Sequence, residues 1–207
     1  VQYVGMKARQ AEKVGIHFHS ANFPSTITTL ELIEEIKKLN NIENMCGIIV
    51  QLPLPTHLDK RAILDSINPR LDVDCLSTIS SQRFYGGNTE IAFPTALACM
   101  QLLNSLNLDN NPSTTLRTRK IVVLGQGMLV GKPVTALLKF QGLDPDIITR
   151  QTENKEEIIK QADVIISGTG QGKYITGGMI KEGVVLIDAG TSEDGGGIVG
   201  DVDLESV

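Results

Sequence analysis

The segment KIVVLGQGMLVGKPV (residues 120–134) constrains the fold of this chain more than any other part of its sequence. It places an apolar strand, a turn with glycines at Gly125, Gly127 and Gly131, and a helix directly after one another. Such a turn lets backbone N–H groups and a helix N-terminus face a pyrophosphate, because no side chain stands in the way. The spacing is one residue longer than the usual dinucleotide fingerprint, so a purely structural turn is the alternative.

Strands and helices are expected to alternate after this turn. Apolar runs at 146–150, 162–170 and 184–190 predict further strands, and helices are predicted after Val130 and over residues 152–161. The polar segment 108–119 (LDNNPSTTLRTR) precedes this series and is the best candidate for a domain boundary.

The first half of the chain shows the same alternation. Strands are predicted over residues 15–23 and 46–52, the second being a continuous apolar run (CGIIVQL) typical of a strand buried in a parallel sheet. This order implies helices that cross over a mostly parallel sheet. Residues 68–95 show no clean period and are expected to form a long functional loop. Helices are predicted for residues 1–14 (with Gly15 as the stop), 28–39, 57–67 and 95–106.

Composition excludes several classes of partner. The net charge of −5 opposes attraction to nucleic-acid backbones and anionic lipid. Aromatic residues make up only 4% of the chain and Trp is absent, which argues against base-stacking platforms. No apolar run approaches the roughly 18 residues that a membrane span requires. We therefore expect small-molecule partners and a second copy of the chain, with no nucleic acid and no membrane.

Cysteine and histidine usage points to a reducing compartment without a metal site. Three cysteines at wide spacing (Cys46, Cys75 and Cys99) do not suggest a disulfide scaffold, and the three histidines lack a ligand pattern. We predict a cytoplasmic protein. The chain starts at Val1 and both of its ends are expected to be cut, so organellar targeting stays an alternative.

The residues after the second strand of the later series bear on the cofactor. An NAD site commonly has an acidic residue there, whereas this strand ends in Arg150 and is followed by Thr152. Arg150 could pair with a 2′-phosphate and Thr152 could add a hydroxyl, which favours NADP over NAD; a solvated arginine is the alternative. Gly168 and Gly190 follow two further strands, where ligands of open α/β sheets bind, although both could be ordinary turn glycines.

Five polar residues in the first half are considered as candidate site residues. Tyr3 and Lys7 lie four apart on a predicted helix and share a face, where an exposed lysine is the ordinary interpretation. Gln51 ends an apolar strand, and a buried amide needs partners. Asp72 and Asp74 flank one valine, but an isolated pair of carboxylates is weak evidence for a metal.

Several segments resemble the methylenetetrahydrofolate dehydrogenase/cyclohydrolase family. CGIIVQLPLPTHLDKRAILDSINPRLDVD (residues 46–74) resembles its signature region, and YVGMKARQAEKVGI (3–16) its lysine-bearing helix. LGQGMLVGKPV (124–134) resembles its cofactor loop, and IKEGVVLIDAG and VGDVD its closing segments. Together these segments cover nearly the whole chain in the family's order.

The resemblance implies a function and roles for particular residues. The family oxidises 5,10-methylenetetrahydrofolate with NADP, or NAD in some members, and hydrolyses the methenyl product to 10-formyltetrahydrofolate. By motif, Lys7 would be the catalytic lysine, Gln51 its hydrogen-bonding partner and Asp74 the carboxylate that holds the pterin. Tyr3 would stack over the aromatic ring of the substrate. A homodimer formed through the cofactor-binding domains is also implied.

The sequence departs from the family at several of these positions. Gln126 and Gly127 stand where the cofactor loop usually has Arg and Ser, which leaves Arg150 as a substitute for the 2′-phosphate clamp. Cys75 replaces a glycine, and Phe93-Pro94-Thr95-Ala96 replaces a P-C-T-P segment. The family's first strand and helix and its C-terminal segment are expected to be missing. These departures keep open a catalytically weak homologue that binds folate or nucleotide without efficient turnover.

We therefore expect an α/β protein with two lobes and mostly parallel sheets. Residues 1–108 would form an N-terminally incomplete folate-binding catalytic domain, and residues 109–207 a Rossmann-type NAD(P)-binding domain. The active-site cleft would lie between the two. An amino-acid- or shikimate-type dehydrogenase of related architecture is a third alternative that the V-Q-L-P-L-P segment disfavours.

Overall fold

The computed structural model describes residues 2–106 and 116–207, with side chains from residue 4 onward. The chain divides into two compact units, Val1–Ser81 and Gln82–Val207. The boundary expected between residues 108 and 109 lies outside the described residues and stays a prediction.

The second unit contains the parallel sheet that the sequence predicts. Its strands are β1 (Ile121–Leu124), β2 (Asp146–Ile148), β3 (Val164–Ser167) and β4 (Val185–Asp188), and they lie in the order β2-β1-β3-β4. The central strands β1 and β3 are buried along their whole length, as continuous apolar runs in a covered parallel sheet should be. All four strands end at the same edge, which makes that edge the place for a ligand.

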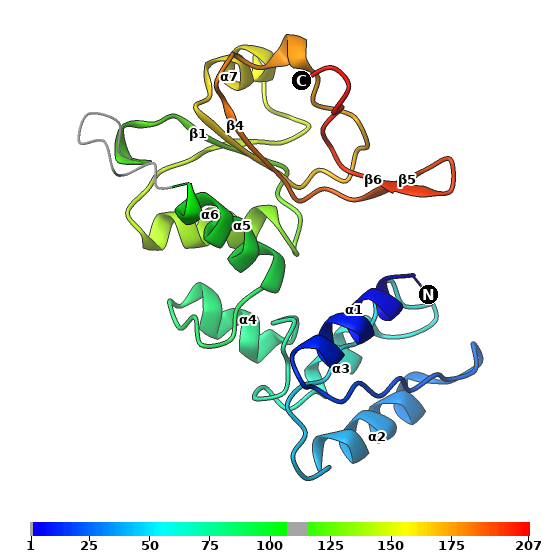
Figure 1. Cartoon of the computed structure of the whole chain (residues 1–207). Helices are drawn as coiled ribbons and strands as arrows, with labels where there is room; N and C mark the ends of the chain where they lie inside the picture. The colour runs from blue at the N-terminus through cyan, green and yellow to red at the C-terminus, as the bar shows by residue number, and fades with distance from the viewer. Residues whose placement is uncertain (1, 107–115) are drawn as a thin grey trace. The chain divides into compact units, whose positions relative to one another are not determined.

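Helices cover both faces of this sheet (Figure 1). Helices α5 (Pro94–Ser105) and α6 (Gly131–Phe140) pack against each other on one face, and α7 (Lys155–Gln161) lies on the other. The buried side chains under α7 include Val122 and Ile165 from the central strands and Ile159 from the helix itself. This alternation of strands and helices confirms the predicted α/β class.

Three small elements of the second unit have no counterpart in the sequence predictions. They are the 3-10 turns η1 (Leu116–Thr118) and η2 (Gly177–Met179), and an antiparallel hairpin of β5 (Ser192–Asp194) and β6 (Gly197–Val199). The hairpin turns at Gly195 and Gly196, both of which have positive φ. Its strands are too short and too polar to show an alternating pattern.

The first unit contains the helices α1 (Gln2–Lys13), α2 (Thr29–Asn40) and α3 (Lys60–Asp65), close to their predicted ranges. Helix α1 is followed by Gly15 with a φ of +76°, as expected for its stop. Helix α2 begins with a capping box between Thr28 and Glu31 and buries Leu32 and Ile36. Local capping and helical spacing were therefore sufficient signals for these three helices.

The two strands predicted in the first unit do not form in the described residues. Residues 17–23 are mostly exposed and make no backbone pairing, and residues 46–52 contribute one isolated bridge, between Ile48 and Asp72. A strand needs a neighbour that takes up its backbone hydrogen bonds, and apolar composition alone does not provide one.

Helix α4 (Thr78–Tyr85) lies within residues 68–95, where the sequence predicted only irregular structure. Asp65 explains its start, because its carboxylate accepts hydrogen bonds from the Thr78 backbone N–H (2.6 Å) and hydroxyl (2.9 Å). The capping residue is distant in sequence from the helix, so no local sequence motif predicts this cap.

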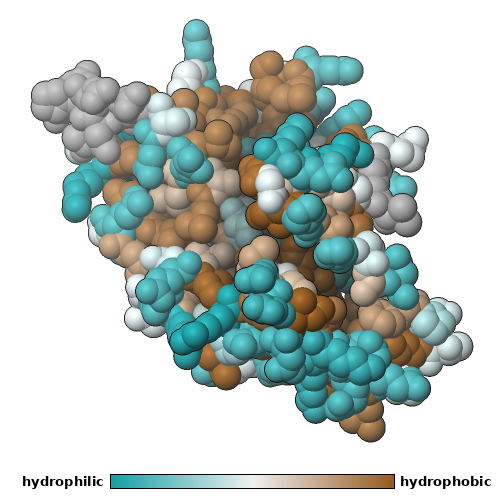
Figure 2. Space-filling view, turned by 60° about the horizontal axis from the view of Figure 1, so that its bottom comes forward, coloured by the Kyte–Doolittle hydropathy of each residue, from teal (hydrophilic) through white to brown (hydrophobic). Residues whose placement is uncertain are grey.

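Hydrophilic and hydrophobic residues are interspersed on the face drawn in Figure 2. Across the described residues, the helices are too short or too polar for any of them to span a bilayer.

Candidate active site and cofactor pocket

Lys7 and Asp74 form an ion pair in the first unit. The Lys7 Nζ atom lies 3.8 Å from Asp74 Oδ2, and the two side chains are 37% and 24% exposed. Both groups are thus partly withdrawn from water while remaining accessible to a ligand. The structure brings together two residues that the sequence predicted as catalytic from opposite ends of this unit.

Hydrogen bonds to Asp72 fix the turn that carries Asp74. The Asp72 side chain is buried, and its carboxylate accepts from the backbone N–H groups of Leu76 (3.1 Å) and Ser77 (2.8 Å). Cys75 lies inside this turn with a φ of +58°, in the left-handed region that favours glycine. Asp72 therefore shapes the loop, and the metal alternative for this pair loses one of its two carboxylates.

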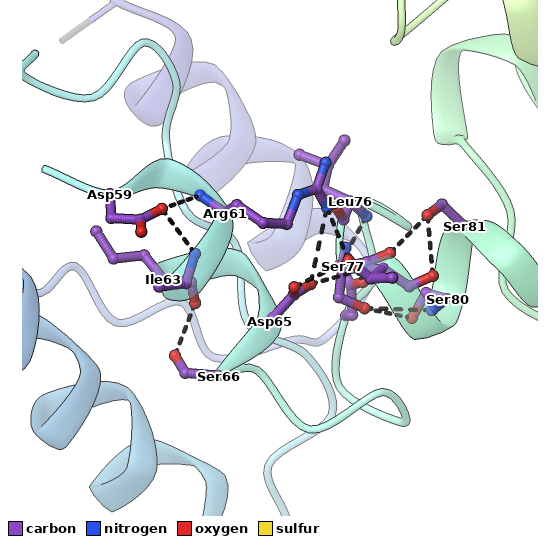
Figure 3. A network of polar contacts seen from close by, with 12 residues as sticks. Asp59, Arg61, Ile63, Asp65, Ser66, Leu76, Ser77, Ser80 and Ser81 are labelled. Atoms are coloured by element: carbon purple, nitrogen blue, oxygen red, sulfur yellow. Dashed lines mark hydrogen bonds and ion pairs between the residues drawn. The ribbon is translucent and has the colours of Figure 1, made fainter.

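A polar network holds the same turn to helix α3 (Figure 3). The Arg61 side chain donates to the Leu76 carbonyl (3.1 Å), and Asp65 binds Thr78 as described above. Asp59 caps the helix that carries both residues by accepting from the Arg61 and Ala62 backbone N–H groups. Asp74 therefore lies in a short segment whose ends are both fixed. Asp72, before it, is bonded to the backbone at Leu76 and Ser77, and the residues after it are bonded to α3.

Burial changes the acid–base properties of this loop. Burial raises the pKa of the Asp74 carboxyl, the Lys7 ammonium partly offsets that rise, and the Asp72 carboxylate adds to it. Burial also raises the pKa of the Cys75 thiol to about 12, with Asp72 adding to the effect. Cys75 therefore stays a protonated thiol at neutral pH and is no nucleophile there.

The other two predicted residues of the first unit are placed differently. Gln51 is exposed rather than buried, and its side-chain amide nitrogen donates to the Leu52 carbonyl (2.9 Å). Tyr3 lies in helix α1, four residues before Lys7, but its side chain is outside the described residues. Roles for Gln51 and Tyr3 therefore stay predictions.

The second unit has a pocket at the carboxyl edge of its parallel sheet. The pocket has a volume of about 450 Å³ and opens where β1, β2 and β3 end. Its walls come from the glycine turn, the turn after β2, the start of α7 and the segment after β3. The lining residues are Leu124, Gly125, Gln126, Gly127, Ile148, Thr149, Arg150, Gln151, Lys155, Gly168, Thr169, Gln171 and Tyr174.

Backbone packing explains why the turn of this pocket needs glycine. Gly125 has a φ of +89°, and a Cβ atom there would lie 2.7 Å from the Gly168 carbonyl oxygen. A Cβ atom on Gly131 would clash with the Gly125 carbonyl. Gly131 is buried at the start of α6 and does not line the pocket, so it closes the turn while Gly125, Gly127 and Gly168 face the cavity.

The turn after β2 presents Arg150 to the pocket. The Thr149 backbone N–H donates to the Thr152 hydroxyl oxygen (2.9 Å), which closes a tight turn around Arg150 and Gln151. Thr152 itself does not line the pocket. It holds the turn in place, and the predicted contact of its hydroxyl with the cofactor stays a prediction.

Gly190 also lies outside the pocket lining. A Cβ atom there would clash with the carboxylate of Asp201, which is fully buried. That carboxylate accepts from the Ser167 hydroxyl (2.5 Å) and from the backbone N–H groups of Thr169 (2.7 Å) and Gln171 (3.0 Å). Asp201, which the sequence analysis did not single out, therefore shapes the pocket wall after β3.

Several lining residues were missed from the sequence. Thr149, Gln151 and Lys155 follow β2 closely, so their position after a strand end was a usable signal. Gln171 and Tyr174 reach the pocket through the loop after β3, and nothing local marks that loop as part of the wall.

Models of two family domains match this chain. The catalytic domain of tetrahydrofolate dehydrogenase/cyclohydrolase matches residues 1–74, and the NAD(P)-binding domain of the same family matches residues 94–207. The ion pair therefore lies in the segment matched by the catalytic domain, and the pocket lies in the segment matched by the NAD(P)-binding domain.

Individual relatives agree with these matches. The bifunctional protein FolD of Clostridium beijerinckii is 35% identical over the whole chain, which covers 71% of that protein. The FolD crystal structure from Campylobacter jejuni superposes with a TM-score of 0.88 at 34% identity, over 100% of this chain and 72% of that one. The FolD structure from Trypanosoma brucei, complexed with NADP and an inhibitor, gives 0.86 at 32% identity, over 99% and 70%.

Proposed function

Because the chain belongs to the tetrahydrofolate dehydrogenase/cyclohydrolase family, we propose that it oxidises 5,10-methylenetetrahydrofolate and hydrolyses the methenyl product to 10-formyltetrahydrofolate. The observation that carries this proposal is the Lys7–Asp74 ion pair, which is partly buried and held by a rigid turn. A lysine and a carboxylate placed in this way can serve proton transfer and substrate orientation at one site.

Lys7 and Asp74 have different tasks in this proposal. Hydrolysis adds water to the cationic methenyl carbon and releases one proton. The bond from that carbon to the ring nitrogen then breaks as the formyl C=O forms, and the hydroxyl proton passes to the freed nitrogen. The Lys7 Nζ atom, in its uncharged amine form, takes up the released proton, while Asp74 accepts hydrogen bonds from adjacent N–H donors of the pterin ring. The Lys7 ammonium favours the ionised form of Asp74, the form that accepts such bonds.

We further propose NADP as the cofactor. The pocket fits a phosphorylated dinucleotide, since its glycine turn exposes backbone and its lining includes Arg150 and Lys155 but no carboxylate. When bound, NADP takes up the hydride that the one-carbon unit loses, so that the substrate is oxidised by two electrons. The role of the chain is to position the cofactor. The turns after β1 and β2 hold the dinucleotide, and the close packing of Gly125 on Gly168 fixes the part of the pocket lining that these two glycines form.

A Lys7→Ala variant tests the proposed hydrolysis. We expect it to lose methenyltetrahydrofolate hydrolysis, by at least about 100-fold as is typical for loss of a general acid–base group. Its circular dichroism and melting temperature should stay close to the parent values, because Lys7 is not part of the buried core. The matched control is Lys13→Ala, an exposed lysine at the end of the same helix. Hydrolysis retained in the folded Lys7→Ala variant would refute the role.

A second candidate is a homologue that binds folate or dinucleotide without efficient turnover. Two observations favour it: Gln126 replaces the arginine expected in the cofactor loop, and the Gln51 amide is bonded to its own backbone neighbour. Direct measurement of turnover separates the two candidates. The homodimer implied by the family resemblance and the domain boundary at residues 108/109 also stay proposals.

A further inference from the structure

The glycine turn itself supplies no cation for a cofactor phosphate. Gln126 stands where the family resemblance predicts an arginine, and its amide nitrogen donates to the Gly125 carbonyl (3.0 Å) and to the buried Thr135 hydroxyl (3.1 Å). Both N–H groups of that amide are thus used within the turn and helix α6. Positive charge in the pocket must come from elsewhere.

Lys155 lies on the pocket wall at the first residue of helix α7. Its side chain is half-buried, and its Nζ atom lies over the Tyr174 ring, 6.0 Å from the centroid. Among the ion pairs of the described residues, none includes Lys155. The ring therefore holds an ammonium group at the pocket wall without neutralising its charge.

Lys155 and Arg150 belong to the same end of the pocket. Both follow β2: Arg150 lies in the tight turn closed by Thr152, and Lys155 comes three residues after Thr152, at the start of α7. In dinucleotide-binding sheets, the end of the second strand is where the adenosine ribose is recognised. An NAD site offers a carboxylate to the ribose hydroxyls there, whereas the charged side chains lining this pocket are these two cations.

We propose that Lys155 determines cofactor specificity by binding, together with Arg150, the 2′-phosphate of an NADP-type dinucleotide, with Tyr174 positioning its ammonium group. This inference rests on the proposed function. A phosphate monoester carries close to two negative charges at neutral pH and suits two cations, while a free 2′-hydroxyl gains nothing from them. Lys155 thereby replaces a charge that Gln126 does not provide.

Equilibrium binding of NADPH and NADH to Lys155→Gln, followed by cofactor fluorescence, tests this inference. We expect NADPH to bind about tenfold more weakly than to the parent protein, the size expected for one charge-assisted hydrogen bond. NADH binding should change less than twofold. Lys155→Arg should restore most of the NADPH affinity, because it returns the charge.

Lys160→Gln is the matched control, since Lys160 is exposed on the same helix and does not line the pocket. It should leave both affinities at the parent values. Unchanged NADPH binding by Lys155→Gln, or an equal loss for NADPH and NADH, overturns the specificity role while the proposed function stands. A parent protein that binds neither dinucleotide contradicts the proposed function as well.

Discussion

At the scale of single residues, Cys75 shows how this chain tolerates a side chain where the family resemblance predicts glycine. Its φ of +58° is unfavourable for a residue with a Cβ atom, by roughly 1 kcal/mol. The buried Asp72 carboxylate imposes this conformation through its bonds to the following backbone N–H groups. The thiol is buried in return, so the position combines backbone strain with apolar contact.

This strain predicts an unusual order of stability for two variants. Cys75→Gly and Cys75→Ala both remove the thiol, but only glycine adopts a positive φ without strain. At an ordinary position glycine would be the less stable variant by roughly 0.5–1 kcal/mol. Here we expect Cys75→Gly to be at least as stable as Cys75→Ala in urea denaturation. A glycine variant clearly less stable than the alanine variant would show that the backbone of this turn is not strained.

Site residues differed in how far the sequence alone could identify them. Lys7 and Asp74 could be identified from the sequence because they lie in recognisable family motifs. The glycines of the cofactor turn could be identified because an apolar strand, the turn and a helix follow one another directly. Gln51 was expected to be buried because its strand was expected to form. Tyr174 lines the pocket, and Asp201 supports its wall by accepting from the Thr169 backbone N–H, only through tertiary packing, which no local pattern encodes.

At the scale of elements, the parallel sheet was predictable because its central strands β1 and β3 are buried along their whole length. Continuous apolar runs such as those of β1 and β3 have few other folds available to them. Residues 46–52 are also an apolar run, but their backbone pairs with another segment only through the isolated bridge between Ile48 and Asp72. The difference lies in the neighbouring backbone, which a single segment does not specify. Helix α4 was missed for the converse reason, because its cap comes from Asp65.

Asp163 connects three segments of the second unit and makes a pH-dependent contribution. It lies just before β3, and its carboxylate accepts from the Lys120 backbone N–H (2.6 Å) ahead of β1 and from Lys181 Nζ (2.6 Å) ahead of β4. The hydrogen bond from Lys181 holds the pKa of Asp163 below its ordinary value, and the Lys120 N–H acts in the same direction. The ionised carboxylate therefore stabilises the fold.

The direction of that pKa shift sets the expected pH profile. A carboxyl whose pKa is lower in the folded state contributes stability above its unfolded pKa of about 4, and loses it as pH falls through the folded pKa. Asp163→Asn should lower the free energy of unfolding at pH 7 and flatten the loss of stability on acidification. The exposed Asp144, replaced in the same way, serves as the control. An unchanged acid profile in Asp163→Asn would contradict the assigned role.

At the scale of the whole molecule, each unit carries one part of the proposed chemistry. The first unit holds the Lys7–Asp74 ion pair, which we propose acts on the folate, and the second holds the pocket proposed for the dinucleotide. The family models match the two parts in the same order. The chain departs from the expected family pattern at Gln126 and Cys75. We propose that the cations after β2 compensate for the first, and the turn that accommodates the second is held by Asp72.

The central claim is that these two units together oxidise a folate with NADP. The absorbance of methenyltetrahydrofolate, followed as the protein acts on 5,10-methylenetetrahydrofolate with NADP and separately with NAD, tests that claim most directly. We expect turnover with NADP and a lower kcat/KM with NAD, because the pocket offers cations and no carboxylate to the ribose. Absence of turnover with both cofactors would contradict the claim and favour a binding protein.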